Sequence, residues 1–353
     1  MDIKSFIIDE STKRIDNRAF FKCRNLTHIH ITENVREIGY YAFGDCTSLN
    51  SITFSPNSKL KRICDYAFSD CISLTHIELP DTLITLGRCV FRNTGIEKIR
   101  IPPSVSNFDI YLFSRCMKLT QIPETLTKIQ EGMFIKCHSF VSPTIPYGVK
   151  VIGDDAFGEC INMRSISIPD TVVTIENGAF SNCQMLEQLE LPPNIIEISD
   201  ECFLDCLSIE TVKIPDKVER IGMSSFAECR GLTSIELSEN ITQIDENAFR
   251  DCKSLASISI PKGVTRICKN VFRNCSSLAR VEARNLRIFN KNVFSGCPNL
   301  AVLEIEDVGD MRTYEDVERI LTHIGIGKTQ IVELNHVFKG DSDRIICNAP
   351  VLK

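Results

Sequence analysis

The chain has 353 residues, of which 43% are hydrophobic and 24% charged, and these proportions are ordinary for a chain that buries a core. The 40 Lys and Arg against 46 Asp and Glu give a net charge of −6. This balance disfavours nucleic acid and anionic membranes as partners, because both are bound by cationic groups. No apolar run reaches the ~18–20 residues of a membrane span, and residues 1–10 lack the apolar stretch of a secretory signal.

Short strands are predicted from the first residues onward. Residues 3–8 carry Ile3, Phe6 and Ile8 in a spacing that recurs along the chain, and apolar residues that alternate at period two predict strands. A proline often follows, and proline fits a strand end because it cannot donate to a sheet ladder. The clearest repeats are residues 26–31, 74–79, 186–191, 232–237 and 255–260, and the full count is fourteen strands.

A Phe turn separates each predicted strand from the next. Its phenylalanines are 20, 43, 68, 91, 113, 134, 157, 180, 203, 226, 249, 272 and 294, most often 23 residues apart. A cysteine follows three residues later in every turn except one, where Thr94 stands after Phe91. Units this short bury an apolar face only when stacked on neighbours, so the repeat predicts a solenoid with a parallel sheet.

The two repeated side chains have structural interpretations. We expect the Phe column to form a buried spine, and the cysteines to be small buried thiols. In-register stacking suits disulfides poorly. The chain also has no Cys-x-x-Cys pair of the kind that structural zinc sites use.

Residues 163–186 show the whole motif: Met163, Ile166, Ile168, Pro169, Val172, Ile175, Ala179, Phe180, Cys183 and Leu186. This pattern resembles the BspA-like class of leucine-rich repeats. The resemblance implies a right-handed repeat solenoid of about 13–14 turns with a parallel sheet on its concave side. It also implies protein binding or adhesion, often at the cell surface, and no enzyme activity. Two turns depart from the pattern: the Phe91 turn is one residue short before Ile96, and two residues are missing before Leu126.

The repeat ends near Leu300, so we expect a solenoid over residues 1–305 and a C-terminal capping segment over residues 306–353. Within this segment a capping box at Thr313 and apolar spacing to Ile324 predict a helix. Residues 329–337 predict a strand, and a polar tail follows at residues 339–344. A separate interaction module is the alternative. The first strand has no predicted cover, so self-association through the uncapped N-terminal end, a covering partner or a longer protein would each protect it.

A binding site is expected on the outward side chains of the concave sheet. His28 and His30 share one strand face, and His76 with Glu78 repeats the arrangement two strands later. That separation is too long for one metal ion to bridge, so we expect a polar surface and no metal site. The acid bias of the distal half favours a protein partner with a basic patch. The candidate residues are His28, His30, His76, Glu78, Arg100, Glu190, Lys213, Glu236, Glu282 and Glu304.

No catalytic constellation or cofactor motif is found. The Gly325–Thr329 segment resembles the end of a phosphate loop, but Thr322 stands where that motif needs glycine. We therefore expect a non-catalytic protein-binding scaffold without cofactors. The many thiols and the lack of a signal favour a cytoplasmic interaction protein. The family resemblance favours the alternative, a surface adhesin or antigen that binds host or matrix proteins and is exported without a classical signal peptide.

Overall fold

The computed structural model describes residues 4–283, 285–286, 288–306, 335–338 and 344–348. The chain forms two compact units, unit 1 from Met1 to Pro169 and unit 2 from Asp170 to Lys353. In each unit the turns carry strands that pair in parallel with strands of adjacent turns. The predicted parallel repeat solenoid is confirmed. The predicted boundary near residue 305 stays a prediction.

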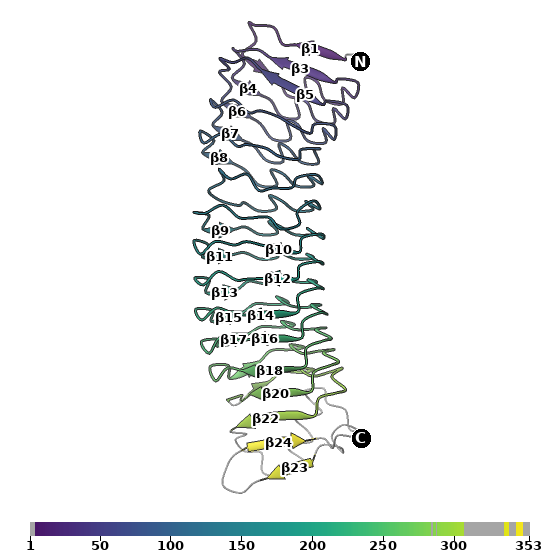
Figure 1. Cartoon of the computed structure of the whole chain (residues 1–353), viewed down its shortest axis with the longest axis vertical. Helices are drawn as coiled ribbons and strands as arrows, with labels where there is room; N and C mark the ends of the chain where they lie inside the picture. The colour runs from purple at the N-terminus through teal and green to yellow at the C-terminus, as the bar shows by residue number, and fades with distance from the viewer. Residues whose placement is uncertain (1–3, 284, 287, 307–334, 339–343, 349–353) are drawn as a thin grey trace. The chain divides into compact units, whose positions relative to one another are not determined.

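In unit 1 the strands form two columns, on opposite sides of the turns in Figure 1. The long-strand column holds the strands predicted from the alternating pattern, and it is named for its longest members, although β10 has only two residues. The short-strand column holds two-residue strands that end in buried residues such as Ile15 and Ile38. The long strands are β1 (Ser5–Ile7), β3 (His28–Ile31), β5 (Ser51–Phe54) and β10 (Ser165–Ile166). The short strands are β2 (Arg14–Ile15), β4 (Glu37–Ile38), β6 (Arg62–Ile63), β7 (Thr85–Leu86), β8 (Asn107–Phe108) and β9 (Val151–Ile152).

Unit 2 repeats the two columns. Its long strands are β12 (Gln188–Leu189), β14 (Thr211–Lys213), β16 (Ser234–Glu236), β18 (Ser257–Ile260), β20 (Arg280–Ala283) and β22 (Val302–Glu306). Its short strands are β11 (Thr174–Ile175), β13 (Glu197–Ile198), β15 (Arg220–Ile221), β17 (Gln243–Ile244), β19 (Arg266–Ile267) and β21 (Ile288–Phe289).

Of the last two described strands, β24 runs against the repeat direction and β23 runs with it. Strand β24 (Arg344–Asn348) pairs antiparallel with β22, and β23 (Asn335–Phe338) pairs antiparallel with β24. The strand predicted at residues 329–337 overlaps β23. The polar tail was predicted to extend to residue 344, but that residue is the first of strand β24. The helix predicted from Thr313 to Ile324 lies outside the described residues.

The Phe spine is present in both units. In unit 1 the rings from Phe20 to Phe157 stack on one another with centroids 5.1–6.0 Å apart. In unit 2 the rings from Phe180 to Phe294 stack at 5.3–5.7 Å. The rings of the Phe turns are buried except Phe20, which is half-buried. Offset stacking of parallel rings is favourable for aromatic pairs, so one ring per turn fills the core and sets its repeat.

The cysteines of the Phe turns join neighbouring turns. The thiol of Cys229 donates to the carbonyl oxygen of Phe203 at 3.1 Å, and the thiol of Cys71 donates to that of Phe43 at 3.2 Å. Burial raises the pKa of Cys229 to about 12, so the thiol stays protonated and able to donate. Thr94 donates instead to the carbonyl of Phe91 in its own turn, at 2.9 Å. The expected small buried residue therefore also supplies a hydrogen bond between turns.

Two sequence expectations need correction. The pattern gave one strand per turn, and the short-strand column was missed because two residues carry no alternation to detect. Fourteen strands were also predicted, one of them at residues 74–79, but the structure has no strand at residues 74–80, 97–101 or 119–122. Phe43 and Phe68 lie 25 residues apart, and the following intervals are 23, 22 and 21. The short strands β4, β6, β7 and β8 of these turns still pair in parallel, so the irregular lengths coincide with a break in the long-strand ladder alone.

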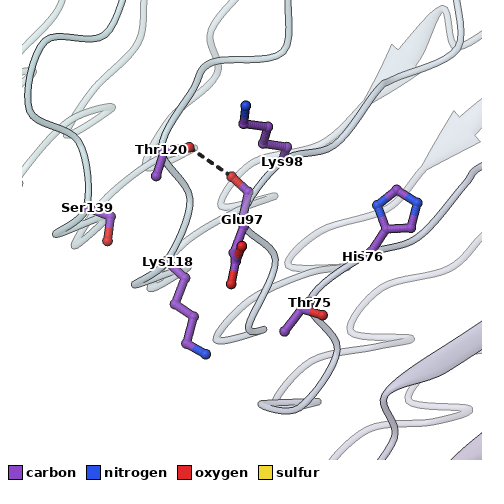
Figure 2. A pocket seen from close by; sticks show the side chains of 7 residues that line it. All are labelled: Thr75, His76, Glu97, Lys98, Lys118, Thr120 and Ser139. Carbon is purple, nitrogen blue, oxygen red and sulfur yellow. Dashed lines mark hydrogen bonds between the residues drawn. The ribbon is translucent and has the colours of Figure 1, made fainter.

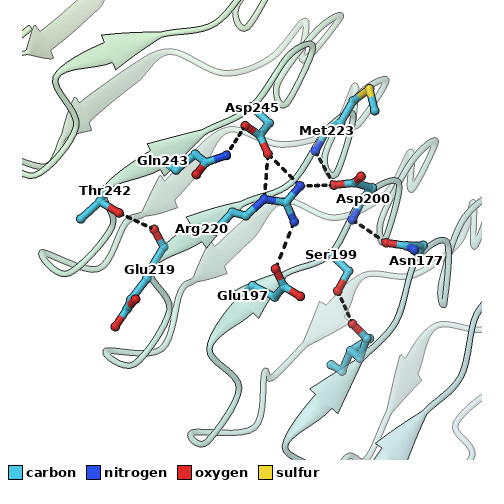
Figure 3. A network of polar contacts seen from close by, with 11 residues as sticks. Asn177, Glu197, Ser199, Asp200, Glu219, Arg220, Met223, Thr242, Gln243 and Asp245 are labelled. Atoms are coloured by element: carbon cyan, nitrogen blue, oxygen red, sulfur yellow. Dashed lines mark hydrogen bonds and ion pairs between the residues drawn. The ribbon is translucent and has the colours of Figure 1, made fainter.

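A charge network stabilises the short-strand face of unit 2 (Figure 3). Arg220 in β15 donates to Glu197 at 3.0 Å on the preceding turn and to Asp245 at 2.8 Å on the following turn. It also bonds Asp200, whose carboxylate accepts the amide of Met223 at 2.9 Å. Burial alone would lower the pKa of Arg220, but the bonds to Asp200 and Glu197 outweigh it and raise the pKa. One side chain thus connects three successive turns.

Candidate binding surface

His28 and His30 hold two long strands of unit 1 together. Strand β3 pairs with β5 in register, with His28 opposite Ser51 and His30 opposite Thr53. The Nδ1 atom of each ring lies within hydrogen-bond distance of that opposite hydroxyl, at 3.0 Å for Ser51 and 2.9 Å for Thr53. The Nε2 atom of His30 lies 3.3 Å from the hydroxyl of Ser55. The side chains share the predicted outward face, where they make polar contacts across the sheet.

Beyond β5 the long-strand ladder of unit 1 stops for three turns. Residues 74–80, 97–101 and 119–122 contain no strand, and pairing resumes only with the bridge between Thr144 and Ser167. Within the described residues, the amides of Ile77, Glu78 and Arg100 donate to no protein acceptor. Ile77 is only 2% exposed, and backbone donors in such places are normally paired with protein or water. The interruption therefore leaves hydrogen-bonding capacity unused by the protein.

A groove lies at this interruption, with a volume of about 1150 Å³. Its lining comes from four successive turns: residues 50–56 and 58, residues 76–82, residues 98–100 and residues 121–125. The groove contains three predicted site residues, His76, Glu78 and Arg100. The carboxylate of Glu78 is 90% exposed and lies 3.5 Å from the ring of His76. Arg100 forms an exposed ion pair with Asp81 at 2.8 Å.

A smaller edge pocket of about 630 Å³ adjoins the groove and shares His76 and Lys98 with it. Its other lining residues are Thr75, Glu97, Lys118, Thr120 and Ser139. Figure 2 shows the side chains of Glu97 and Lys118 extending toward the same side of the pocket. The hydroxyl of Thr120 donates to the carbonyl of Glu97 at 3.2 Å. The pocket thus presents two lysines and one carboxylate beside the groove.

The remaining predicted residues lie in unit 2. Lys213 and Glu236 stand opposite each other in β14 and β16, and their charged groups are 3.3 Å apart. Glu282 accepts a bond from Arg280 at 2.8 Å. Glu190 is exposed immediately after β12. The backbone of Glu304 stands opposite Glu282 in β22, and its side chain lies outside the described part.

Sequence reasoning missed the groove and most of the edge pocket. Lys98 and Gln121, which line the groove, are not among the predicted candidate residues. Lys118, Thr120 and Ser139 had no signal of their own. The two shortened turns, before Ile96 and before Leu126, mark the interrupted region, and they were the available clue. The arrangement offers unpaired amides and exposed charges of both signs, which suits recognition of a polypeptide.

These features define a repeat protein with polar surfaces on its strands. The family model described as BspA type leucine rich repeat region (6 copies) matches residues 1–120, 117–231 and 196–314. The chain therefore belongs to the BspA-type leucine-rich repeat family, as its motif predicted.

Solved structures agree with this assignment. A leucine-rich repeat protein from Bacteroides ovatus is 28% identical, with a TM-score of 0.70 over 84% of this chain and 85% of that chain. A leucine rich cell surface protein from Faecalibacterium prausnitzii is 25% identical, with a TM-score of 0.52 over 93% of this chain and 92% of that chain. A leucine-rich repeat protein from Eubacterium ventriosum is similar in fold, at 23% identity and a TM-score of 0.58 over 78% of this chain and 83% of that chain.

A search of curated proteins finds no match. In the part of the chain that the structure describes, no helix has the length and apolar character needed to span a bilayer.

Proposed function

We propose that this protein is a non-catalytic binding scaffold whose groove in unit 1 accepts an extended segment of a partner protein. The observation that carries the proposal is the interrupted ladder. The amides of Ile77, Glu78 and Arg100 lack protein acceptors where two adjacent long-strand segments face the groove. A peptide segment in the groove can supply carbonyls to the amides along one edge of these segments, and main-chain pairing of this kind is a common way for sheets to bind peptides.

The side chains around the groove would give selectivity. The groove presents the carboxylates of Glu78 and Asp81 beside the guanidinium of Arg100, so it suits a segment that carries both charges. Solvent-exposed pairs of this kind contribute little stability. A partner can therefore replace the bond between Arg100 and Asp81 at small cost.

The outward face of unit 2 would contribute a second contact surface, which is mainly acidic. Its acidic residues Glu190, Glu236, Glu282 and Glu304 outnumber Lys213 in the predicted column, which favours a basic patch on the partner. Charges on such a face act mainly on the rate and specificity of association.

We place the protein at the cell surface. The similar F. prausnitzii protein is described as a cell surface protein, which supports the surface alternative over the cytoplasmic one. The thiols do not oppose this location, because most of those in the Phe turns are buried, and burial raises the pKa of Cys160 to about 12. Protonated, buried thiols resist oxidation. Protease treatment of intact source cells should remove the protein, whereas protection until lysis would contradict a surface location.

Site-specific photo-crosslinking tests the binding proposal. A photoreactive amino acid at Glu78, which is exposed in the groove, should give a covalent adduct with one partner in source cells. The matched control is Tyr147, which is 82% exposed in the same unit and does not line the groove. An adduct at position 78 but not at 147 supports the groove. No adduct at position 78, or equal adducts at both positions, would refute it.

A further inference from the structure

The Phe turns place two residues in the left-handed backbone region, two positions before and two positions after the phenylalanine. In unit 2 the earlier position is held by Gly178, Glu201, Ser224, Asn247, Asn270 and Asn292. In unit 1 three of these positions are tyrosines: Tyr41 (φ 50°), Tyr66 (φ 57°) and Tyr111 (φ 58°). Glycine and asparagine adopt this backbone readily and a bulky residue does not. Every Phe turn has this backbone, so it belongs to the repeat, and tyrosine at three turns of unit 1 is not what the turn itself favours.

Two of these tyrosines form a partly exposed aromatic cluster with Tyr40 and Phe21. The rings of Tyr41 and Tyr66 stack at 4.7 Å. Tyr40, which is 37% exposed, packs edge-on against Tyr41 at 4.5 Å, and Phe21 packs edge-on against Tyr41 at 5.5 Å. Tyr41, Tyr66 and Phe21 are half-buried. The fold of the turn therefore presents a platform of four rings to solvent.

Cations lie against this platform. The guanidinium of Arg18 is 5.7 Å from the ring of Phe21 and 5.8 Å from that of Tyr40, and the ammonium of Lys22 is 5.2 Å from the ring of Phe21. The neighbouring Arg14 and Arg24 have acidic partners, Glu37 and Asp45. Within the described residues, Arg18 and Lys22 form no ion pair. The platform thus carries positive charge that the protein itself does not neutralise.

We propose that this aromatic platform, formed by Phe21, Tyr40, Tyr41 and Tyr66 with Arg18 and Lys22, is a second interaction surface that binds an acidic segment of a partner protein. Tyrosine and arginine are the residues most enriched at the energetic centres of protein interfaces. The rings supply rigid contact area at little entropic cost, and the two cations select carboxylates. The surface is formed by the Phe turns and is distinct from the long-strand groove. The inference shares with the proposed function only the premise that this chain binds proteins.

Fluorescence polarisation of the full chain with a fluorescein-labelled glutamate-rich peptide tests this surface. The peptide should bind at low ionic strength more tightly than a lysine-rich counterpart, and binding should weaken with salt. Arg18→Ala and Tyr40→Ala should each reduce the affinity about tenfold or more. Both side chains are exposed, so these variants should fold. Matched controls at Tyr147→Ala and Lys150→Ala, which change exposed residues of the same unit, should bind as the unaltered protein does.

The result separates this surface from the groove. Arg100→Ala should leave binding of the glutamate-rich peptide unchanged, and crosslinking at Glu78 does not depend on the platform. Failure of the peptide to bind the unaltered chain would overturn the platform and leave the groove proposal standing. Equal losses of peptide affinity in Tyr147→Ala and Tyr40→Ala, or no loss of affinity in Arg18→Ala, would also overturn the platform proposal.

Discussion

The stacked Phe spine gives a quantitative prediction at Phe113. This ring is fully buried and lies 5.7 Å from the rings of both Phe91 and Phe134. Truncating a buried phenylalanine to alanine costs about 3–5 kcal/mol of unfolding free energy, and each stacked pair adds about 0.5–1.5 kcal/mol beyond area burial. Because Phe113 has two such partners, Phe113→Ala should fall near the upper end, at about 4–5 kcal/mol.

Phe20→Ala is the matched comparison in the same unit. Phe20 is half-buried and stacks on Phe43 alone, with Phe6 at its edge. Its loss should cost about 2 kcal/mol, since less apolar area returns to water. Urea unfolding followed by circular dichroism measures both values, with the slope compared to detect loss of cooperativity. Equal costs for the two variants, or a cost under about 1 kcal/mol at Phe113, would refute a continuous spine.

Three further predictions follow from the hydrogen bonds and charges. Cys229→Val should lower the free energy of unfolding in urea by about 1 kcal/mol, because the carbonyl of Phe203 loses a thiol donor but keeps the amide of Cys206. Cys229→Ser keeps a donor and should cost less. A larger cost for serine than for valine would contradict the hydrogen bond between turns. Alkaline pH should destabilise the fold, because burial raises the pKa values of Cys160 and Cys229 from 9.0 to about 12. The contribution of these thiols to the free energy of unfolding is complete below about pH 9 and is lost toward pH 12, as the thiols of the unfolded chain ionise. The loss is about 1.4 kcal/mol per pH unit for each thiol. Under reducing conditions Cys229→Ala should make this slope shallower, and a slope that is unchanged would count against the buried thiol. Arg220→Met should lower the free energy of unfolding by about 1–3 kcal/mol, less than the loss of a fully buried pair, because the network is partly exposed. Arg220→Lys should not restore this stability, since one ammonium cannot reach Glu197, Asp200 and Asp245 together. Full rescue by lysine would show that charge alone suffices.

The sequence predicted the fold well because the solenoid repeats its core residues. Phe, Cys and the strand Ile or Leu recur at a nearly fixed interval, so the parallel stacking, the buried spine and the family could be inferred together. The short-strand column could not, because strands such as Arg14–Ile15 have too few residues for a period. The acceptor of the Cys229 thiol was not predicted either, since a thiol in a sequence does not indicate which carbonyl it faces.

The candidate site was predicted in part. The outward direction of His30, Lys213 and Glu236 follows from alternation along a strand, and the structure places all three in their long strands. The groove around Glu78 and Arg100 depends on where the long strands of adjacent turns fail to pair, and alternation along one strand does not show this. The aromatic platform was missed because Tyr41 and Tyr66 come together from different turns, at positions the motif leaves unspecified.

Native-state hydrogen exchange of the backbone amides in unit 1 tests whether the long-strand ladder is interrupted at the groove. If it is, the amides of Ile77, Glu78 and Arg100 should exchange rapidly. The amides of Ser51 and Ser55, which donate to the carbonyls of Thr27 and Ile31, should be protected. Equal protection in the two regions would show that the ladder is continuous and would remove the basis for strand addition at the groove.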